Sequence, residues 1–372
     1  MRIFHIEPGH IRESADLEAL SAQGLEQQGY VWIACGRPEF EAEQMRVQAA
    51  LQALCGVQLV DLHISNLINK QLPSHYDYTS QYDVLVFRRL AASSTAKPGA
   101  APVTGAPAGR LSGPPILRRI DTSPVGFAVF DRVLLTVHPD DCTVRDTYAD
   151  KLLQTASAES RAAGARLPTS PADLMLRIVN SMVDGYLALR RELTQQLDHW
   201  QSELLSPRAR FTNWSALLEA RMALHQLDDV CEEQRSSIQD WIEAIKTWPE
   251  PESPLEARER ELLQVRSRDV LEHIERVVHH VRRLEQSVET AVQMHFSVQG
   301  SRTNDIMRTL TVLTAIFLPL NLIAAIFGMN FDFIPLLHKQ DGFWWTMGGM
   351  LTIGVSLAVI FWRKRYLART TR

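Results

Sequence analysis

The stretch LTVLTAIFLPLNLIAAIFGMN, Leu310–Asn330, decides how this chain is organised. It forms most of an apolar run from about Ile306 to Phe327, in which the only charged residue is Arg308, near the start. A helix needs about 20 apolar residues to cross the hydrocarbon core of a bilayer, and this run has that length. A second run, Phe343 to Trp362, is similar in length and contains no charge. The sequence therefore predicts two membrane-spanning helices near its C-terminus.

Basic residues predict how this pair of helices is oriented. Arg302 and Arg308 stand at the start of the first run, and the residues after the second run include Arg363, Lys364, Arg365, Arg369 and Arg372. The connector between the runs holds a single lysine, Lys339. Because loops rich in Lys and Arg stay on the cytoplasmic side, we expect both termini in the cytoplasm and the connector outside. We expect the membrane to be the inner membrane of the cell.

One face of the first run is polar or small, although a membrane helix is usually apolar. Steps of three and four residues give this stripe, which we call the α-stripe: Asn304, Met307, Thr311, Thr314, Leu318, Asn321, Ala325 and Gly328. An asparagine inside a membrane is costly unless it faces protein or water. The α-stripe therefore fits either a packing seam of small residues between helices or the wall of a water-lined pore. A pore requires several copies of the helix.

The composition excludes several functional classes. Among 372 residues, 39 Lys and Arg nearly balance 43 Asp and Glu, so we expect no nucleic-acid partner. The four cysteines, Cys35, Cys55, Cys142 and Cys231, form no CxxC pair and suggest neither a zinc site nor a disulfide framework. The N-terminal MRIFHIEPGHIRES lacks a long apolar run, so we expect no signal peptide. We find no phosphate-binding loop and no nucleophile–base constellation, and we expect no enzyme and no organic cofactor.

The N-terminal part, residues 1–170, is predicted to be a mixed α/β domain. Residues 30–35, 82–90 and 125–138 are rich in β-branched and aromatic residues, as strands are. A helix between the first two strands should stop at Gly56. Residues 91–115 are rich in Ala, Pro and Gly without periodicity, which predicts a disordered insertion.

Long helices follow this domain. We expect a helical hairpin over 171–254 and then a stalk helix over 255–327 that continues into the first membrane span, about 306–327. The stalk carries a sustained heptad pattern that includes Val270, Ile274, Val277, Val281, Leu284, Val288, Ala291, His295 and Val298. At about 1.5 Å per residue, such a helix would be about 110 Å long. An outer loop over 328–342, a second span over 343–362 and a basic tail over 363–372 complete the expected order.

These residues together resemble a known family. The segment TNDIMRTLTVLTAIFLPLNLIAAIFGMNF, Thr303–Phe331, resembles the first membrane helix of the CorA divalent-cation channels and ends with their GMN signature. The resemblance covers about 255–369. It implies an α+β cytoplasmic domain, a long stalk helix and two C-terminal transmembrane helices. It also implies a funnel-shaped homopentamer in the lipid bilayer, with the first helices around a pore.

The resemblance also implies roles for individual residues. Asn330 would form a ring at the outer mouth and contact the hydrated ion, with Gly328 and Met329 shaping that ring. The pore would be lined by Asn304, Met307, Leu310 or Thr311, Thr314, Leu318, Asn321 and Ala325. The run RDVLEH, 268–273, places Asp269 at a regulatory cation site between subunits. This chain departs from the family at IPLL, 334–337, where Leu336 stands in place of a common acid, and at Asn321 and Ala325, where Thr and Gly are common.

We therefore expect Mg²⁺, and with it Co²⁺, to enter the cell through this protein down the membrane potential, under control by intracellular Mg²⁺. One alternative is a zinc transporter of the ZntB type, with or without proton coupling. Zn²⁺ favours His and Cys ligands, and residues 304–330 contain neither. A second alternative is a two-span signalling or scaffold protein. We interpret His273, His280 and His295 as histidines at the edge of a helical core rather than as metal ligands.

Overall fold

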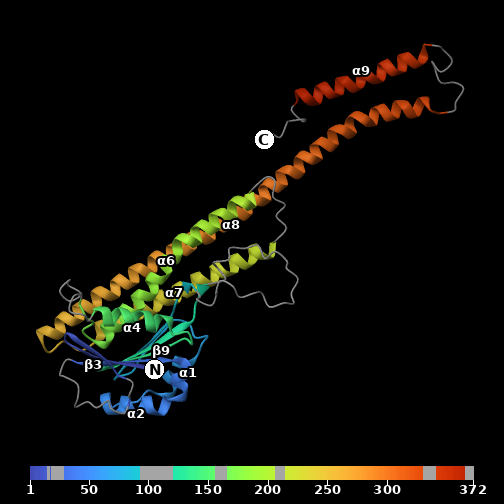
Figure 1. Cartoon of the computed structure of the whole chain (residues 1–372). Helices are drawn as coiled ribbons and strands as arrows, with labels where there is room; N and C mark the ends of the chain where they lie inside the picture. The colour runs from blue at the N-terminus through green and yellow to red at the C-terminus, as the bar shows by residue number, and fades with distance from the viewer. Residues whose placement is uncertain are drawn as a thin grey trace. The chain divides into compact units, whose positions relative to one another are not determined.

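The computed structural model describes residues 1–14, 17, 29–92, 120–155, 166–205, 214–329 and 341–364. The chain divides into two compact units, Met1–Glu289 and Thr290–Arg372. The first unit combines a β-sheet with helices, and the second contains apolar helices (Figure 1). The fold is thus the α+β domain, long helix and helix pair expected from the sequence.

Seven strands form one sheet in the order β2-β1-β3-β9-β8-β5-β4. They are β1 (Arg2–Glu7), β2 (His10–Ser14), β3 (Tyr30–Gly36), β4 (His75–Tyr78), β5 (Asp83–Arg88), β8 (Pro124–Val129) and β9 (Val133–His138). The pair β3–β9 is parallel, and the other neighbouring pairs are antiparallel. Two short strands, β6 (Ala91–Ala92) and β7 (Ile120–Asp121), form a separate pair.

The three predicted strand segments lie in this sheet, but the sequence pattern misses part of it. Residues 125–138 form two strands, β8 and β9, because a turn reverses the chain and Phe130 N–H donates to the Val133 carbonyl at 2.9 Å. The hairpin β1–β2 and the edge strand β4 are additional. Their short, charged sequences carry little of the alternation that identifies a strand. Of the predicted insertion 91–115, residues 93–115 lie outside the described part of the chain.

The sheet is covered by helices on both faces (Figure 1). On one face lie α1 (Arg37–Ala42), α2 (Gln44–Cys55) and α3 (Asp61–Ile68), and on the other lies α4 (Thr143–Thr155). Ile33 points toward α1–α3, whereas its neighbour Trp32 contacts Tyr148 of α4 edge to face, with the ring centroids 6.1 Å apart. Helix α2 ends as predicted at Gly56, whose φ of 72° is in the left-handed region that suits glycine.

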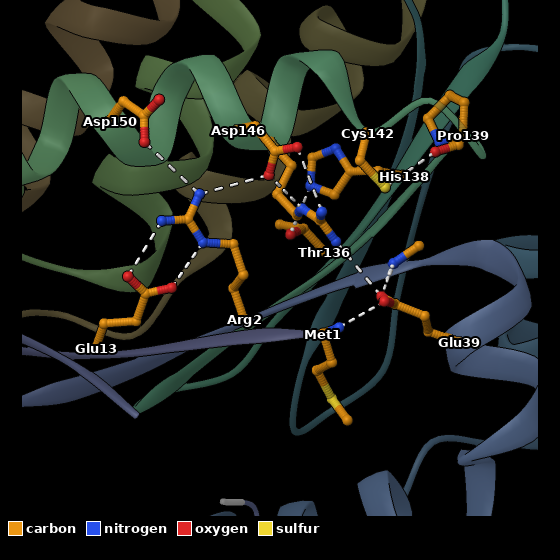
Figure 2. A network of polar contacts seen from close by, with 12 residues as sticks. Met1, Arg2, Glu13, Glu39, Thr136, His138, Pro139, Cys142, Asp146 and Asp150 are labelled. Carbon is orange, nitrogen blue, oxygen red and sulfur yellow. Dashed lines mark hydrogen bonds and ion pairs between the residues drawn. The ribbon is translucent and has the colours of Figure 1, made fainter. Parts of the chain in front are cut away.

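A polar network ties the first strands to α1 and α4 (Figure 2). The Met1 amino group lies 2.6 Å from Glu39, and Arg145 of α4 lies 3.4 Å from the same carboxylate. Arg2 binds Glu13 of β2 at 2.7 Å and Asp146 of α4 at 3.4 Å. These pairs join β1, β2, α1 and α4 at the edge where β3 and β9 end.

Three long helices follow: α6 (Pro171–Leu205), α7 (Trp214–Thr247) and α8 (Pro254–Phe327). The first part of α8 packs against α6 and α7. The heptad positions from Val270 to Ala291 are buried, which confirms the predicted seam over these residues, whereas Val298 at its predicted end is 45% exposed. Polar contacts fix the register: Trp241 Nε1 of α7 donates to Ser267 of α8 at 3.0 Å, and Gln201 of α6 donates to Ser287 at 2.9 Å.

The second unit contains the end of α8 and helix α9 (Gly342–Arg363). Both helices are long and apolar enough to cross a membrane, and only 6% and 0% of their most apolar windows are buried within the chain. Apolar side chains this exposed are unfavourable in water and favourable in lipid. Helix α8 is continuous across the predicted stalk and first span, and it passes through Pro319 without ending.

Candidate functional site

Helix α9 covers one side of the apolar end of α8. A Cβ added to Gly354 of α9 would lie 3.6 Å from Leu320 of α8, an ordinary van der Waals distance, so the two helices are in contact at this point. A cavity of about 500 Å³ lies between the two helices, lined by residues that include Ile323 and Phe327 of α8 and Trp345 of α9. Leu320, Ile323 and Phe327 therefore mark the face of α8 that is turned toward α9.

The α-stripe lies on the opposite side of α8. Ile323 is about 200° around the helix from Asn321, at about 100° per residue. Every residue of the α-stripe, and Leu310 with it, is exposed in the single chain: Asn304, Met307, Leu310, Thr311, Thr314, Leu318, Asn321, Ala325 and Gly328. The polar face thus remains uncovered by α9 and is available to other copies of α8 or to water.

The threonines of the α-stripe are held by their own helix. Thr311 Oγ1 donates to the Met307 carbonyl at 2.7 Å, and Thr314 Oγ1 donates to the Leu310 carbonyl at 2.9 Å. Each hydroxyl proton is thereby satisfied inside the helix. The remaining oxygen lone pairs can accept hydrogen bonds, and water bound to a cation presents donors of that kind.

The outer end of α8 is closely wound at the GMN signature. Gly328 N–H donates to the Ala324 carbonyl at 2.9 Å, and Met329 N–H to the Ile326 carbonyl at 3.3 Å. A Cβ added to Gly328 would lie only 3.2 Å from the Ala324 oxygen, so a larger residue would crowd this last turn. Asn330 and the loop containing IPLL lie outside the described residues.

Asp269 lies on the part of α8 that belongs to the first unit. Its side chain is 59% exposed, and one carboxylate oxygen is 3.8 Å from Nε2 of His273, one turn later. His273 Nδ1 is 3.0 Å from the side-chain oxygen of Asn180 and 3.8 Å from Asp184, both on α6. Asp269 also borders a cavity of about 190 Å³ between α4, α6 and α8, and much of its side chain faces solvent.

The sequence pattern does not identify the α6 residues that contact His273 beside Asp269. Asn180 and Asp184 belong to a different helix, and no local pattern connects them to α8. His273 could be found, because it lies four residues after Asp269 on one helical face. As expected, His280 is a core histidine: it is buried beside Tyr186, and burial, with Arg190 and Arg283 next, lowers its pKa to about 4.

The side chains of one chain do not build a metal cage in the ranges that the structure describes. No group of three or more His, Cys, Asp or Glu residues there is arranged to hold a metal ion. The α-stripe offers amide, hydroxyl and carbonyl oxygens, which are the ligands that hard cations such as Mg²⁺ prefer.

The fold is that of an α+β domain followed by a helix of 74 residues, and the apolar end of this helix and the next helix are two candidate membrane spans. Residues 109–365 match the family described as CorA-like Mg²⁺ transporter protein. That match covers well over half of the chain, and the chain belongs to this family.

Individual relatives agree with this assignment. The chain is 27% identical over 194 residues to the cobalt/magnesium transport protein CorA of Thermotoga maritima, which is 52% of each sequence. The match thus spans about half the length of that relative. The superposition with the complete structure of the CorA magnesium transporter from Methanocaldococcus jannaschii covers 98% of each chain, with a TM-score of 0.65 and 17% sequence identity. The structure of the full-length CmaX protein covers 98% of this chain and 97% of its own, with a TM-score of 0.58 at 17% identity. At these identities the two structures show a shared fold.

Proposed function

We propose that this protein is a channel for divalent cations that carries Mg²⁺, and also Co²⁺, into the cell. The observation that carries the proposal is the position of the α-stripe: a polar face on an apolar helix, turned away from α9 and left open. Membership of the CorA-like family and the names of the relatives support this ion choice. Several copies of α8, five by the family resemblance, would bring their α-stripes together around a pore in the inner membrane.

The chemistry of the proposed pore suits a hydrated ion. Mg²⁺ loses its water reluctantly, and amide and hydroxyl oxygens can accept hydrogen bonds from that water without stripping it. A ring of Asn330 at the outer mouth would select the ion in this way, whereas a ring of carboxylates would hold the ion more tightly and slow its release. With both termini cytoplasmic, a divalent ion moving inward gains about 4–5 kcal/mol per 100 mV, twice the value for a single charge.

We propose that Asp269 regulates the channel. In the assembly, intracellular Mg²⁺ would bridge Asp269 to a group on the neighbouring subunit and hold the closed state. When intracellular Mg²⁺ falls, the uncompensated carboxylates would repel one another and the long helices would separate. The exposure of Asp269 supports this role, because a carboxylate buried within its own subunit could not reach a shared ion.

The experiment is a flux assay with the purified protein in liposomes. Mg²⁺, Co²⁺ and Zn²⁺ uptake should be measured with and without an inside-negative potential, and for Asn330→Ala beside the unaltered chain. We expect Mg²⁺ and Co²⁺ flux that increases with the potential and changes in Asn330→Ala. Zinc flux that depends on a pH gradient, without Mg²⁺ flux, would instead support the ZntB-type alternative. A protein that conducts none of the three ions would support the scaffold alternative.

A further inference from the structure

A large cavity lies within the first unit, and neither Asp269 nor any residue of the α-stripe lines it. It has a volume of about 1530 Å³ and is bordered by β4, β5, the β8–β9 turn, the end of α7 and the first turns of α8. Cavities that bind small molecules usually measure about 300–1,000 Å³, so this one has room for an extended ligand and its water. The proposed pore and the Asp269 site do not use it.

Five aromatic residues line the cavity. Tyr76 and Tyr78 of β4 stack with their ring centroids 6.0 Å apart, and Tyr82 and Phe130 meet at 4.8 Å. Trp248, after α7, also lines the cavity. The Tyr78 side chain is 67% exposed although it is a large aromatic residue. Exposed rings of this kind offer their electron-rich faces to organic cations.

The same wall is strongly acidic. Nine carboxylate residues line the cavity against two arginines, Arg132 and Arg260. Arg260 is directed elsewhere, because its guanidinium donates to the carbonyls of Ile245, Lys246 and Pro249 at 2.9–3.0 Å, where α7 ends. Arg260 therefore caps a helix with its charge still at the wall, and Lys246 pairs with Glu243 at 2.6 Å, but the lining carboxylates still far outnumber these cations.

Two of these carboxylates are partly buried close to other acidic groups. Burial raises the pKa of Glu259, and Asp173 and Glu256 raise it further. Burial also raises the pKa of Asp83; the hydrogen bond from Tyr76 lowers it, and Asp131 raises it. A cation in the cavity would relieve this repulsion.

Part of the wall is held in place before any ligand arrives. His63 is buried and lies between two lining residues, with Nε2 3.1 Å from Asp77 and Nδ1 2.9 Å from the Tyr82 hydroxyl. Val60 N–H also donates to that hydroxyl, at 3.0 Å. A wall fixed in this way loses little conformational freedom when it binds a ligand.

From this combination we propose that the cavity binds a linear polyamine, in which ammonium groups are separated by short methylene chains. Spaced ammonium groups match carboxylates that are distributed around a wall, and the methylene chains and ammonium groups both suit the tyrosine faces. A compact metal ion fits less well, since the described residues bring no three carboxylate, His or Cys side chains together around one point. The proposal concerns binding alone and does not depend on ion transport.

The test is isothermal titration of the full-length protein in detergent with spermidine. We expect saturable binding that weakens about two- to fivefold in Tyr78→Leu through loss of the ring and about fivefold in Glu259→Gln through loss of the charge. Glu261→Gln removes an exposed carboxylate from the same helix but outside the cavity, and it should leave the affinity unchanged. Unfolding midpoints of the variants equal to that of the parent would establish that they are folded.

Other results would overturn the proposal. Absence of saturable heat, or equal affinity in the parent and both cavity variants, would mean that spermidine does not bind there. Mg²⁺ could also displace spermidine as effectively as putrescine does at matched ionic strength. That result would mean that the cavity attracts cations in general and is not specific for polyamines. If a basic peptide competes with spermidine and binds more tightly, the cavity is a binding site for a protein partner and not for a polyamine.

Discussion

Replacing Asp269 by asparagine should weaken the inhibition of ion flux by intracellular Mg²⁺. The change keeps the size of the side chain and removes one negative charge from each subunit. Because this side chain is 59% exposed, its interaction with a bound cation takes place largely in water, and the dielectric constant of water is appropriate. Among the described residues, the change removes a 3.8 Å approach to His273 and a charge interaction with Arg266, both at an exposed position, so the fold should tolerate it.

The size of the effect follows from Coulomb's law. A hydrated Mg²⁺ separated from the carboxylate by one water lies about 5 Å from its charge. At that distance the attraction between the doubly charged cation and one carboxylate is about 1.7 kcal/mol in water. We therefore expect the half-inhibitory Mg²⁺ concentration to rise about 15-fold for each carboxylate that holds the ion, since about 1.4 kcal/mol corresponds to a factor of ten.

The assay is Co²⁺ uptake into liposomes at increasing internal Mg²⁺, with proteins of known orientation. Glu261→Gln is the matched control, because it removes a charge from an exposed position of the same helix two turns earlier. Its inhibition curve should coincide with that of the parent. An unchanged curve for Asp269→Asn would refute the proposed regulatory site, and an equal shift in both variants would mean that only the net charge of the helix matters.

Three further predictions concern packing, pH and the pore. Ser267→Ala should destabilise the protein by about 1–3 kcal/mol and lower its thermal unfolding midpoint, because it leaves the buried N–H of Trp241 without its acceptor; an unchanged midpoint would contradict this. Burial, and then the charges of nearby arginines, lowers the pKa of His138 to about 3. The unfolded chain therefore binds a proton at this residue that the folded chain does not, and the contribution of His138 to the free energy of unfolding should fall by about 1.4 kcal/mol per pH unit as the pH drops from 6.5 towards 3. The midpoint of His138→Gln should fall less steeply over this range, whereas that of exposed His10→Gln should follow the parent; parallel curves for all three would exclude His138 as the source. Thr314→Val, which removes a hydroxyl from the α-stripe at nearly constant shape, should reduce Mg²⁺ flux about three- to tenfold, the loss of one hydrogen bond to passing water; undiminished flux would place Thr314 outside the pore.

The order of the main helices and membrane spans along the chain could be predicted because it depends on patterns that are local in the sequence. The apolar runs, the heptads of α8 and the stop at Gly56 each follow from residues within a few turns of one another. Helix α8 begins at Pro254 and ends at Phe327, where the apolar run ends. Continuity through Gly300 and Pro319 was also foreseeable, since neither residue alone ends a helix that is well supported on both sides.

Tertiary contacts could not be predicted in the same way. The contacts of His273, which lies beside Asp269, come from α6, far away in sequence, and appear only when α6 packs on α8. The acidic cavity likewise joins β4, the β8–β9 turn and α8, whose residues show no shared motif. Gly126 illustrates the limit: it looks like an ordinary strand glycine, yet a Cβ there would lie 2.4 Å from Leu67 of α3.

The most direct test of the proposed pore asks whether water reaches the α-stripe and not the α9 side of the same helix. In a chain whose four cysteines are replaced by serine, Asn321→Cys and Ile323→Cys place single thiols on opposite sides of α8. A small water-soluble thiol reagent should modify the Asn321→Cys protein in liposomes and block its Mg²⁺ flux, and should leave the Ile323→Cys protein unmodified and conducting. Equal modification of both positions, or modification of Asn321→Cys without any change in flux, would contradict a pore lined by the α-stripe.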